Sequence, residues 1–191
     1  MLPSHLALTA EIEAFRAQFE RLAEDADALV APLSDAQFTW RPAADAWSVA
    51  DCIEHLNVVA RLYLPSLDAG IADAIRRGMY AGGPFAYNWI GRFFVYMLEP
   101  PSKLKTRTPA AFRPASGRSR HEIMAAFRAY QVQFIDRLRQ ANGLDLARAR
   151  VLSPAGRWIR IPLGSAFAMM AAHERRHLWQ ARKVTFEAGF P

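Results

Sequence analysis

Residues 166–184 read AFAMMAAHERRHLWQARKV and carry the pattern that decides the fold. Residues on one face of this segment recur at steps of three or four, as in an α-helix: Ala166, Met170, His173, His177, Ala181 and Val184. That face is apolar except for its histidines. We therefore predict a helix from about Gly164 to Phe186 whose histidine-bearing face turns toward a core.

Three further segments carry the same helical spacing of apolar residues, at about 6–31, 48–78 and 119–142. Four amphipathic segments of this length favour an all-α fold, a four-helix bundle in one domain over residues 1–191. The second and third helices are separated by about forty residues, which is far longer than an ordinary loop. We expect this segment to cross the bundle and to contain a short helix at 87–98. A short extended piece is expected at 157–161.

Local signals fix where two of the helices begin. Ser48 followed by Asp51 is typical of a helix cap with an acid in the first turn. Ser119 followed by Glu122 fits the S-x-x-E capping box. Pro65 lies inside the second helical segment, so we expect a kink or a break there.

Composition bounds the class of protein. Hydrophobic residues make up 52% of the 191 residues and charged residues 22%, which is a globular composition. No apolar run reaches the length of a membrane span, and no basic segment followed by an apolar one opens the sequence. The single cysteine, Cys52, excludes an internal disulfide. We therefore expect a cytoplasmic protein without a signal peptide or a membrane partner.

Histidines provide the strongest chemical signal. His173 and His177 are four residues apart, which puts two imidazoles on one helix face where they can share one metal ion. His55 lies beside the apolar stripe of the second helix, about two turns from its start. We interpret these three residues as ligands of one divalent ion. The alternative for His55 is a hydrogen-bonded core histidine without a metal.

The segment His173-Glu174-Arg175-Arg176-His177 also matches H-E-x-x-H, the zinc-protease motif. The extended form of that motif requires glycine where Gln180 stands and histidine where Lys183 stands. Glu187 lies past the expected end of the helix. We therefore reject a metalloprotease.

Three neutral ligands leave one coordination position open for water or substrate, as in catalytic zinc sites. The first hypothesis is therefore a metal-dependent transferase or hydrolase acting on a small molecule. The second is a non-catalytic protein in which the ion holds two helices together. The third is an anion-binding protein, because net charge is +6 and residues 100–121 carry no acid. No nucleic-acid-binding motif accompanies this basic stretch, so nucleic acid is the weaker partner.

Two stretches of the sequence resemble the signatures of the DinB-like superfamily. Residues 47–56, WSVADCIEHL, are similar to W-S-x-x-E-x-x-x-H-L, with Asp51 where the family often has glutamate. Residues 173–180, HERRHLWQ, are similar to the closing H-x-x-x-H-x-x-Q. Residues 112–114, FRP, and Phe127 fit between them, so the resemblance covers nearly the whole chain.

The resemblance implies an up-down-down-up four-helix bundle with a long crossover between helices two and three. It implies a divalent ion, often nickel, zinc, iron or manganese, on His55, His173 and His177. The superfamily includes S-transferases and isomerases that use low-molecular-weight thiols, bacillithiol or mycothiol, and metal-dependent hydrolases. Homodimers are common in it.

The sequence also suggests roles for residues near the histidines, from less specific patterns. Gln180 follows His177 by three residues and can hydrogen-bond a ring nitrogen as an outer partner of the site. Cys52 is expected to be a small core residue, and Glu174 a salt-bridge partner on the flank of its helix. The aromatic residues of the crossover either cover the bundle or roof a substrate pocket. Its basic residues either face solvent or dock an anionic thiol: Lys103, Lys105, Arg107, Arg113, Arg118 and Arg120.

Overall fold

A computed structural model of the chain describes residues 7–87, 89–101, 107–156 and 158–191. The opening residues, Lys103, Lys105 and Arg157 lie outside the described residues. Helices and strands follow one another along the chain as α1 Ala10–Val30, α2 Asp35–Thr39, α3 Val49–Arg76, α4 Trp89–Leu98, a 3-10 turn Ala110–Phe112, α5 Arg120–Gln140, β1 Arg150–Leu152, β2 Arg160–Pro162 and α6 Leu163–Val184.

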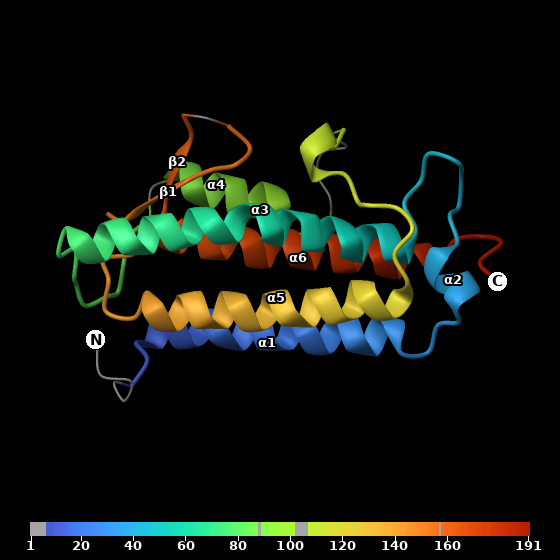
Figure 1. Ribbon diagram of the computed structural model, residues 1–191, viewed down its shortest axis with the longest axis horizontal. Helices are drawn as coiled ribbons and strands as arrows, with labels where there is room; N and C mark the ends of the chain where they lie inside the picture. The colour runs from blue at the N-terminus through green and yellow to red at the C-terminus, as the bar shows by residue number, and fades with distance from the viewer. Residues whose placement is uncertain (1–6, 88, 102–106, 157) are drawn as a thin grey trace.

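Four long helices, α1, α3, α5 and α6, lie side by side (Figure 1). The helix α3 contacts α5 and α6, and α1 contacts the same two helices from the other side. In Figure 1, α1 and α6 run in one direction while α3 and α5 run in the other. The prediction of an all-α protein is confirmed in this broad sense. The described residues add to it the two-stranded sheet of β1 and β2.

The core lies between the four long helices. Its largest fully buried side chains include five phenylalanines that come from α1, α2, α5 and α6: Phe19, Phe38, Phe127, Phe134 and Phe167. The rings of Phe19 and Phe134 stack with centroids 4.9 Å apart, which joins α1 to α5. No helix of the described residues is long and apolar enough to cross a membrane.

Both predicted helix starts are confirmed. Ser48 accepts a hydrogen bond from the backbone N–H of Asp51, and the Asp51 carboxylate accepts one from the backbone N–H of Ser48. Arg41 makes two hydrogen bonds of 2.8 Å to the same carboxylate. Ser119 and Glu122 form the matching capping box of α5. These caps fix the start of α3, and therefore the depth of His55 in the bundle.

Of the kink or break predicted at Pro65, the break is wrong, because α3 runs through this residue without interruption. Pro65 and Arg61, four residues before it, are both exposed. Water can therefore solvate the carbonyl of Arg61 that loses its N–H partner to the proline. The cost of an internal proline is low on a solvent-facing side of a helix.

The β-hairpin packs against α3. Strand β1 pairs antiparallel with β2, and the predicted extended piece overlaps β2. At Gly70 the hairpin approaches the helix so closely that an added Cβ would lie 2.7 Å from the carbonyl oxygen of Arg150. Glycine is required there because the neighbouring atom is backbone and cannot move aside.

We expect Gly70→Ala to lower the free energy of unfolding by about 1–2 kcal/mol, because overpacking outweighs the better helix propensity of alanine. Urea denaturation monitored by circular dichroism measures this difference. Gly82→Ala is the matched control, since no atom lies within 4 Å of its added Cβ. Equal stability of the two variants would contradict the close approach.

Candidate metal centre

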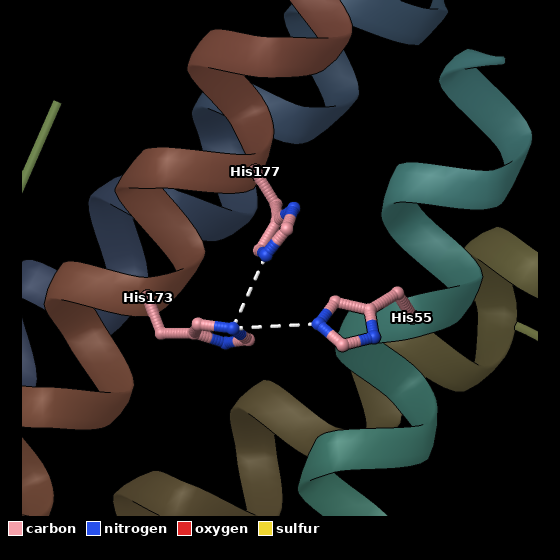
Figure 2. Close-up of side chains that lie close together, drawn as sticks. All are labelled: His55, His173 and His177. Atoms are coloured by element: carbon pink, nitrogen blue, oxygen red, sulfur yellow. Dashed lines mark hydrogen bonds between the residues drawn. The ribbon is translucent and has the colours of Figure 1, made fainter. Parts of the chain in front are cut away.

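Three histidine rings meet between α3 and α6. His55 projects from α3, while His173 and His177 project from consecutive turns of α6 (Figure 2). His55 and His177 are buried, and His173 keeps partial exposure. The two helices run in opposite directions, so the first turns of α3 lie beside the last turns of α6 (Figure 1).

The Nε2 atoms of the three rings point at one another. Nε2 of His173 lies 3.3 Å from Nε2 of His55 and 3.1 Å from Nε2 of His177. The three atoms all lie within 4.8 Å of one another. Two nitrogens on one tetrahedral zinc ion are about 3.3 Å apart at the usual Zn–N distance. The arrangement can therefore hold a metal ion.

Outer partners fix the tautomers of two rings. Nδ1 of His55 lies 2.6 Å from the carbonyl oxygen of Phe112, and Nδ1 of His177 lies 3.0 Å from Oε1 of Gln180. Both oxygens are acceptors, so each Nδ1 donates its N–H and each Nε2 keeps a lone pair. A proton on Nε2 of His173 can satisfy only one of these two lone pairs. At least one Nε2 lone pair therefore has no hydrogen-bond donor within the cluster. A divalent cation bound between the rings would accept all of these lone pairs.

The surroundings keep the rings uncharged. Burial lowers the pKa of His173 to about 3, with a further contribution from the neighbouring ring of His55 and from Arg176. Burial also lowers the pKa of His55 and places that of His177 well below its usual value. Neutral imidazole is the form that binds metal. At neutral pH, therefore, protons do not compete for the three lone pairs.

An open cavity of about 1480 Å³ adjoins the histidines. Its wall includes the apolar side chains of Trp47, Phe112, Met169 and Trp179. Cationic side chains also line it: Arg41, Arg107, Arg113, Arg176 and Lys183. A cavity of this size, with an apolar wall and a few polar groups, is typical of a small-molecule site.

Trp47 and Phe112 belong to stretches that resemble the superfamily signatures, but the sequence did not predict that they contact the histidines. The ring of Trp47 stacks on His177 with centroids 5.6 Å apart and lies 5.0 Å from His55. Phe112 contributes its backbone carbonyl, which no side-chain pattern reveals. The position of Trp47 beside Ser48 offered a signal, because the residue before a helix cap often packs against the first turns.

Glu174 is not the salt-bridge partner that the sequence suggested. Its side chain is buried against α5, where its Oε2 accepts a hydrogen bond of 3.0 Å from Nε2 of Gln131. Burial raises the pKa of Glu174 to about 8. Oε1 of Gln131 is buried without a hydrogen-bond partner among the described residues. The flank of α6 faces another helix rather than solvent, which explains the wrong expectation.

We expect Glu174→Gln to become more stable relative to wild type as pH rises. A folded-state pKa of about 8 means that the stability contributed by the protonated acid is complete below about pH 4.5 and is lost between there and about pH 8. The free energy of unfolding of Glu174→Gln, relative to that of wild type, should therefore rise by about 1.4 kcal/mol per pH unit between about pH 4.5 and pH 8. Urea denaturation of the metal-free proteins at pH 5 and pH 8 measures it.

Glu122→Gln is the control for this pH dependence. Hydrogen bonds from Ser119 lower the pKa of Glu122, so this carboxylate is already ionised at pH 5. The stability difference between Glu122→Gln and wild type should be the same at pH 5 and pH 8. An equally constant difference for Glu174→Gln would show that the buried group is charged throughout.

Neither Cys52 nor the aromatic residues between positions 80 and 96 of the crossover line the cavity beside the histidines in the described part of the chain. Cys52 is fully buried in the hydrophobic core, where burial raises the pKa of its thiol. Among the α4 side chains that the structure describes, only Leu98 lines the cavity beside the histidines. In the described part of the chain, the aromatic crossover therefore does not roof this cavity. Arg107 and Arg113 from the basic stretch do line it.

A buried ion pair supports the helix that carries His55. Glu54 is almost fully buried, and Nη1 of Arg118 lies 3.0 Å and 2.8 Å from its two carboxylate oxygens. Nδ2 of Asn57 donates to Glu54 at 2.9 Å and to the carbonyl of Ile123 at 3.0 Å. These bonds join α3 to the start of α5.

The fold and the histidine cluster define a helical protein with a candidate metal centre between two antiparallel helices. The family model of the DinB superfamily matches residues 18–181, so the chain belongs to this superfamily. Searches of curated proteins and of solved structures found no match.

Proposed function

We propose that His55, His173 and His177 bind one divalent ion through their Nε2 atoms and leave a coordination position open to the cavity. The protein would then be a metal-dependent enzyme of thiol S-transferase or hydrolase type acting on a small molecule. The observation that carries this proposal is the convergence of two fixed Nε2 lone pairs on a third Nε2 beside a large cavity.

When bound, a divalent ion supplies Lewis-acid activation of a thiol or of water. The chain's own residues would do the rest. The carbonyl of Phe112 and the amide of Gln180 hold two rings in the correct tautomer. Five cationic side chains, Arg107, Arg113 and Lys183 among them, line the cavity against three carboxylates, Asp45, Asp51 and Glu187, and this excess of positive charge would attract an anionic substrate or thiolate.

Other parts of the proposal rest on membership of the superfamily. The ion would be nickel, zinc, iron or manganese, and a low-molecular-weight thiol would be the second reactant. The up-down-down-up four-helix bundle is supported by the directions of α1, α3, α5 and α6 in Figure 1. A single domain over 1–191 and a cytoplasmic location stay predictions.

Cobalt substitution tests whether the site has an open position. We expect the Co²⁺-loaded protein to show visible bands of a four- or five-coordinate ion. Adding a small thiol should produce a sulfur-to-cobalt charge-transfer band in the near ultraviolet. In a separate titration, azide should shift the visible bands of the cobalt ion. A spectrum that responds to neither ligand would indicate a closed site, in which the ion only joins α3 to α6.

A further inference from the structure

The cavity beside the histidines extends along α3 and α6 in both directions. The two helices run antiparallel, so residues that follow His55 on α3 lie beside residues that precede His173 on α6 (Figure 1). In Figure 1 the β-hairpin lies toward that end of the two helices, and α2 lies toward the other end. The histidines therefore stand between two ends of one cavity, whose lining side chains can be compared.

The end of the cavity toward the hairpin is lined by uncharged, mostly apolar side chains. Its described lining residues come from α3, from α6 and from the turn of the hairpin: Val59, Tyr63, Met169, Met170 and Ala155. We call these residues the apolar end. Water in a space with such a lining finds few hydrogen-bond partners, so a hydrocarbon group that displaces the water is favoured.

Tyr63 adds a hydroxyl to the apolar end, and this hydroxyl is already paired. Its oxygen lies 3.0 Å from Oγ of Ser153. Burial raises the pKa of Tyr63, which keeps the hydroxyl uncharged at neutral pH. A ligand therefore need not supply a polar group to satisfy this side chain.

Charged side chains line the cavity at the histidines and toward α2. On α6, Arg176 lies between the two histidines, and Lys183 lies further toward the C-terminus. Asp51, in the first turn of α3, is paired with Arg41. Arg113 directly follows the residue whose carbonyl oxygen accepts a hydrogen bond from the histidine of α3. Within the described residues, charge lines one direction from the histidines and hydrocarbon lines the other.

We propose that the apolar end binds the hydrocarbon part of an amphipathic substrate, a small aliphatic acid whose anionic group lies at the histidines. This inference rests on the proposed function, because the anionic group would take the open position on the ion. The excess of cationic side chains over carboxylates in the cavity favours an anion there. Met169 and Met170 suit hydrocarbon groups of differing shape, because the methionine side chain is unbranched and flexible.

Helix geometry sets the length of the hydrocarbon part. Positions 55 and 63 of α3 lie about 12 Å apart along the axis, at about 1.5 Å per residue. An extended chain advances roughly 1.2 Å per bond. The ring of Tyr63 occupies part of this length, because helical side chains lean toward the N-terminus. We therefore expect chains of about six to eight carbon atoms to fill the apolar end.

Calorimetric titration of the zinc-loaded full chain with acetate, butyrate, hexanoate, octanoate and decanoate tests the inference. The affinity should rise about threefold to fourfold for each added methylene, as far as about six to eight carbon atoms, and then level off. An affinity that does not change with chain length would overturn the inference.

Met169→Gln tests whether the hydrocarbon chain lies in the apolar end. The amide keeps the length of the side chain but replaces apolar surface with polar atoms. The ratio of hexanoate affinity to acetate affinity should therefore fall at least about fivefold. Met79→Gln is the matched control, since Met79 is also partly buried against the core but does not line the cavity. It should keep the wild-type ratio, and equal ratios in the two variants would contradict this placement of the chain.

Methionine-methyl NMR of the wild-type protein locates the chain without a substitution in the site. Hexanoate, compared with acetate, should shift the methyl resonances of Met169 and Met170 and leave that of Met79 in place. Shifts of equal size at all three methyl groups would show that the chain binds elsewhere, and the inference would then be wrong.

The same titrations of the metal-free protein separate this inference from the proposed function. The gain per methylene should persist without zinc, because it comes from hydrocarbon contacts, whereas every affinity should fall because the carboxylate loses the ion. A gain per methylene with equal affinities in the two forms would support the apolar end and contradict the open metal position. Tighter binding by the zinc-loaded form, without a gain per methylene, would support the metal site and overturn the inference.

Discussion

His173→Ala should abolish stoichiometric binding of a divalent ion. Nε2 of His173 is the atom that lies within 3.3 Å of both other Nε2 atoms, so its removal leaves a pair of ligands on different helices. Loss of an outer hydrogen-bond partner of a metal ligand already weakens binding about 10–100-fold. Loss of the ligand itself should therefore weaken zinc binding by more than about 100-fold, measured by competition with a chromophoric chelator.

His121→Ala is the control for this loss. His121 is exposed at the start of α5 and belongs to no cluster of potential ligands within the described residues. Its replacement should leave both the stoichiometry and the affinity of zinc binding unchanged. Gln180→Ala should fall between the two, because it removes the acceptor that fixes the tautomer of His177 but leaves the ring in place. Zinc affinity that is the same in His173→Ala and wild type would refute the assignment.

Arg118→Met should lower the free energy of unfolding by about 2–3 kcal/mol. It leaves the buried carboxylate of Glu54 without its cation, and such a loss typically costs about 3–5 kcal/mol in a fully buried pair. The expected value is smaller because Arg118 is about one-third exposed and water can partly replace it. Urea denaturation of the metal-free protein measures the change.

Two further variants separate charge from packing in this prediction. Glu54→Gln in the Arg118→Met background removes the unpaired charge and should recover more than half of the lost stability. Arg128→Met removes an arginine of α5 whose partner, Asp27, keeps 42% of its side-chain surface exposed, so it should cost less than about 1 kcal/mol. A loss in Arg118→Met no larger than in Arg128→Met would show that the Glu54 pair is not a stabilising contact.

Much of the fold follows from patterns that are local in sequence. Apolar residues at helical spacing locate α1, α3, α5 and α6, because the burial of one face is what holds each helix in place. Ser48 and Ser119 mark helix starts through hydrogen bonds to residues three positions away. Strand β1 and the continuity of α3 through Pro65 depend instead on tertiary surroundings, and the sequence pattern did not indicate them.

In the candidate site too, some features follow from local sequence and others depend on contacts between distant segments. The spacing of His173 and His177 places both rings on one helix face, and the position of His55 beside the apolar stripe of its helix, together with the resemblance, predicts that it joins them. The carbonyl of Phe112, the stacking of Trp47 and the burial of Glu174 arise from contacts between distant segments. Glu174 shows most clearly what the sequence does not predict, because its position on the flank of the helix suggested a salt bridge, whereas its side chain is buried against Gln131 of α5. Side-chain type alone does not reveal which flank of a helix another helix will cover.

X-ray absorption spectroscopy of the zinc-loaded protein tests the central claim most directly, because it reports the atoms bound to the ion. The account predicts one zinc ion per chain with three imidazole nitrogens at about 2.0 Å and one further oxygen or nitrogen ligand in the open position. A spectrum with fewer than three imidazoles, or with a sulfur ligand from Cys52, would contradict it.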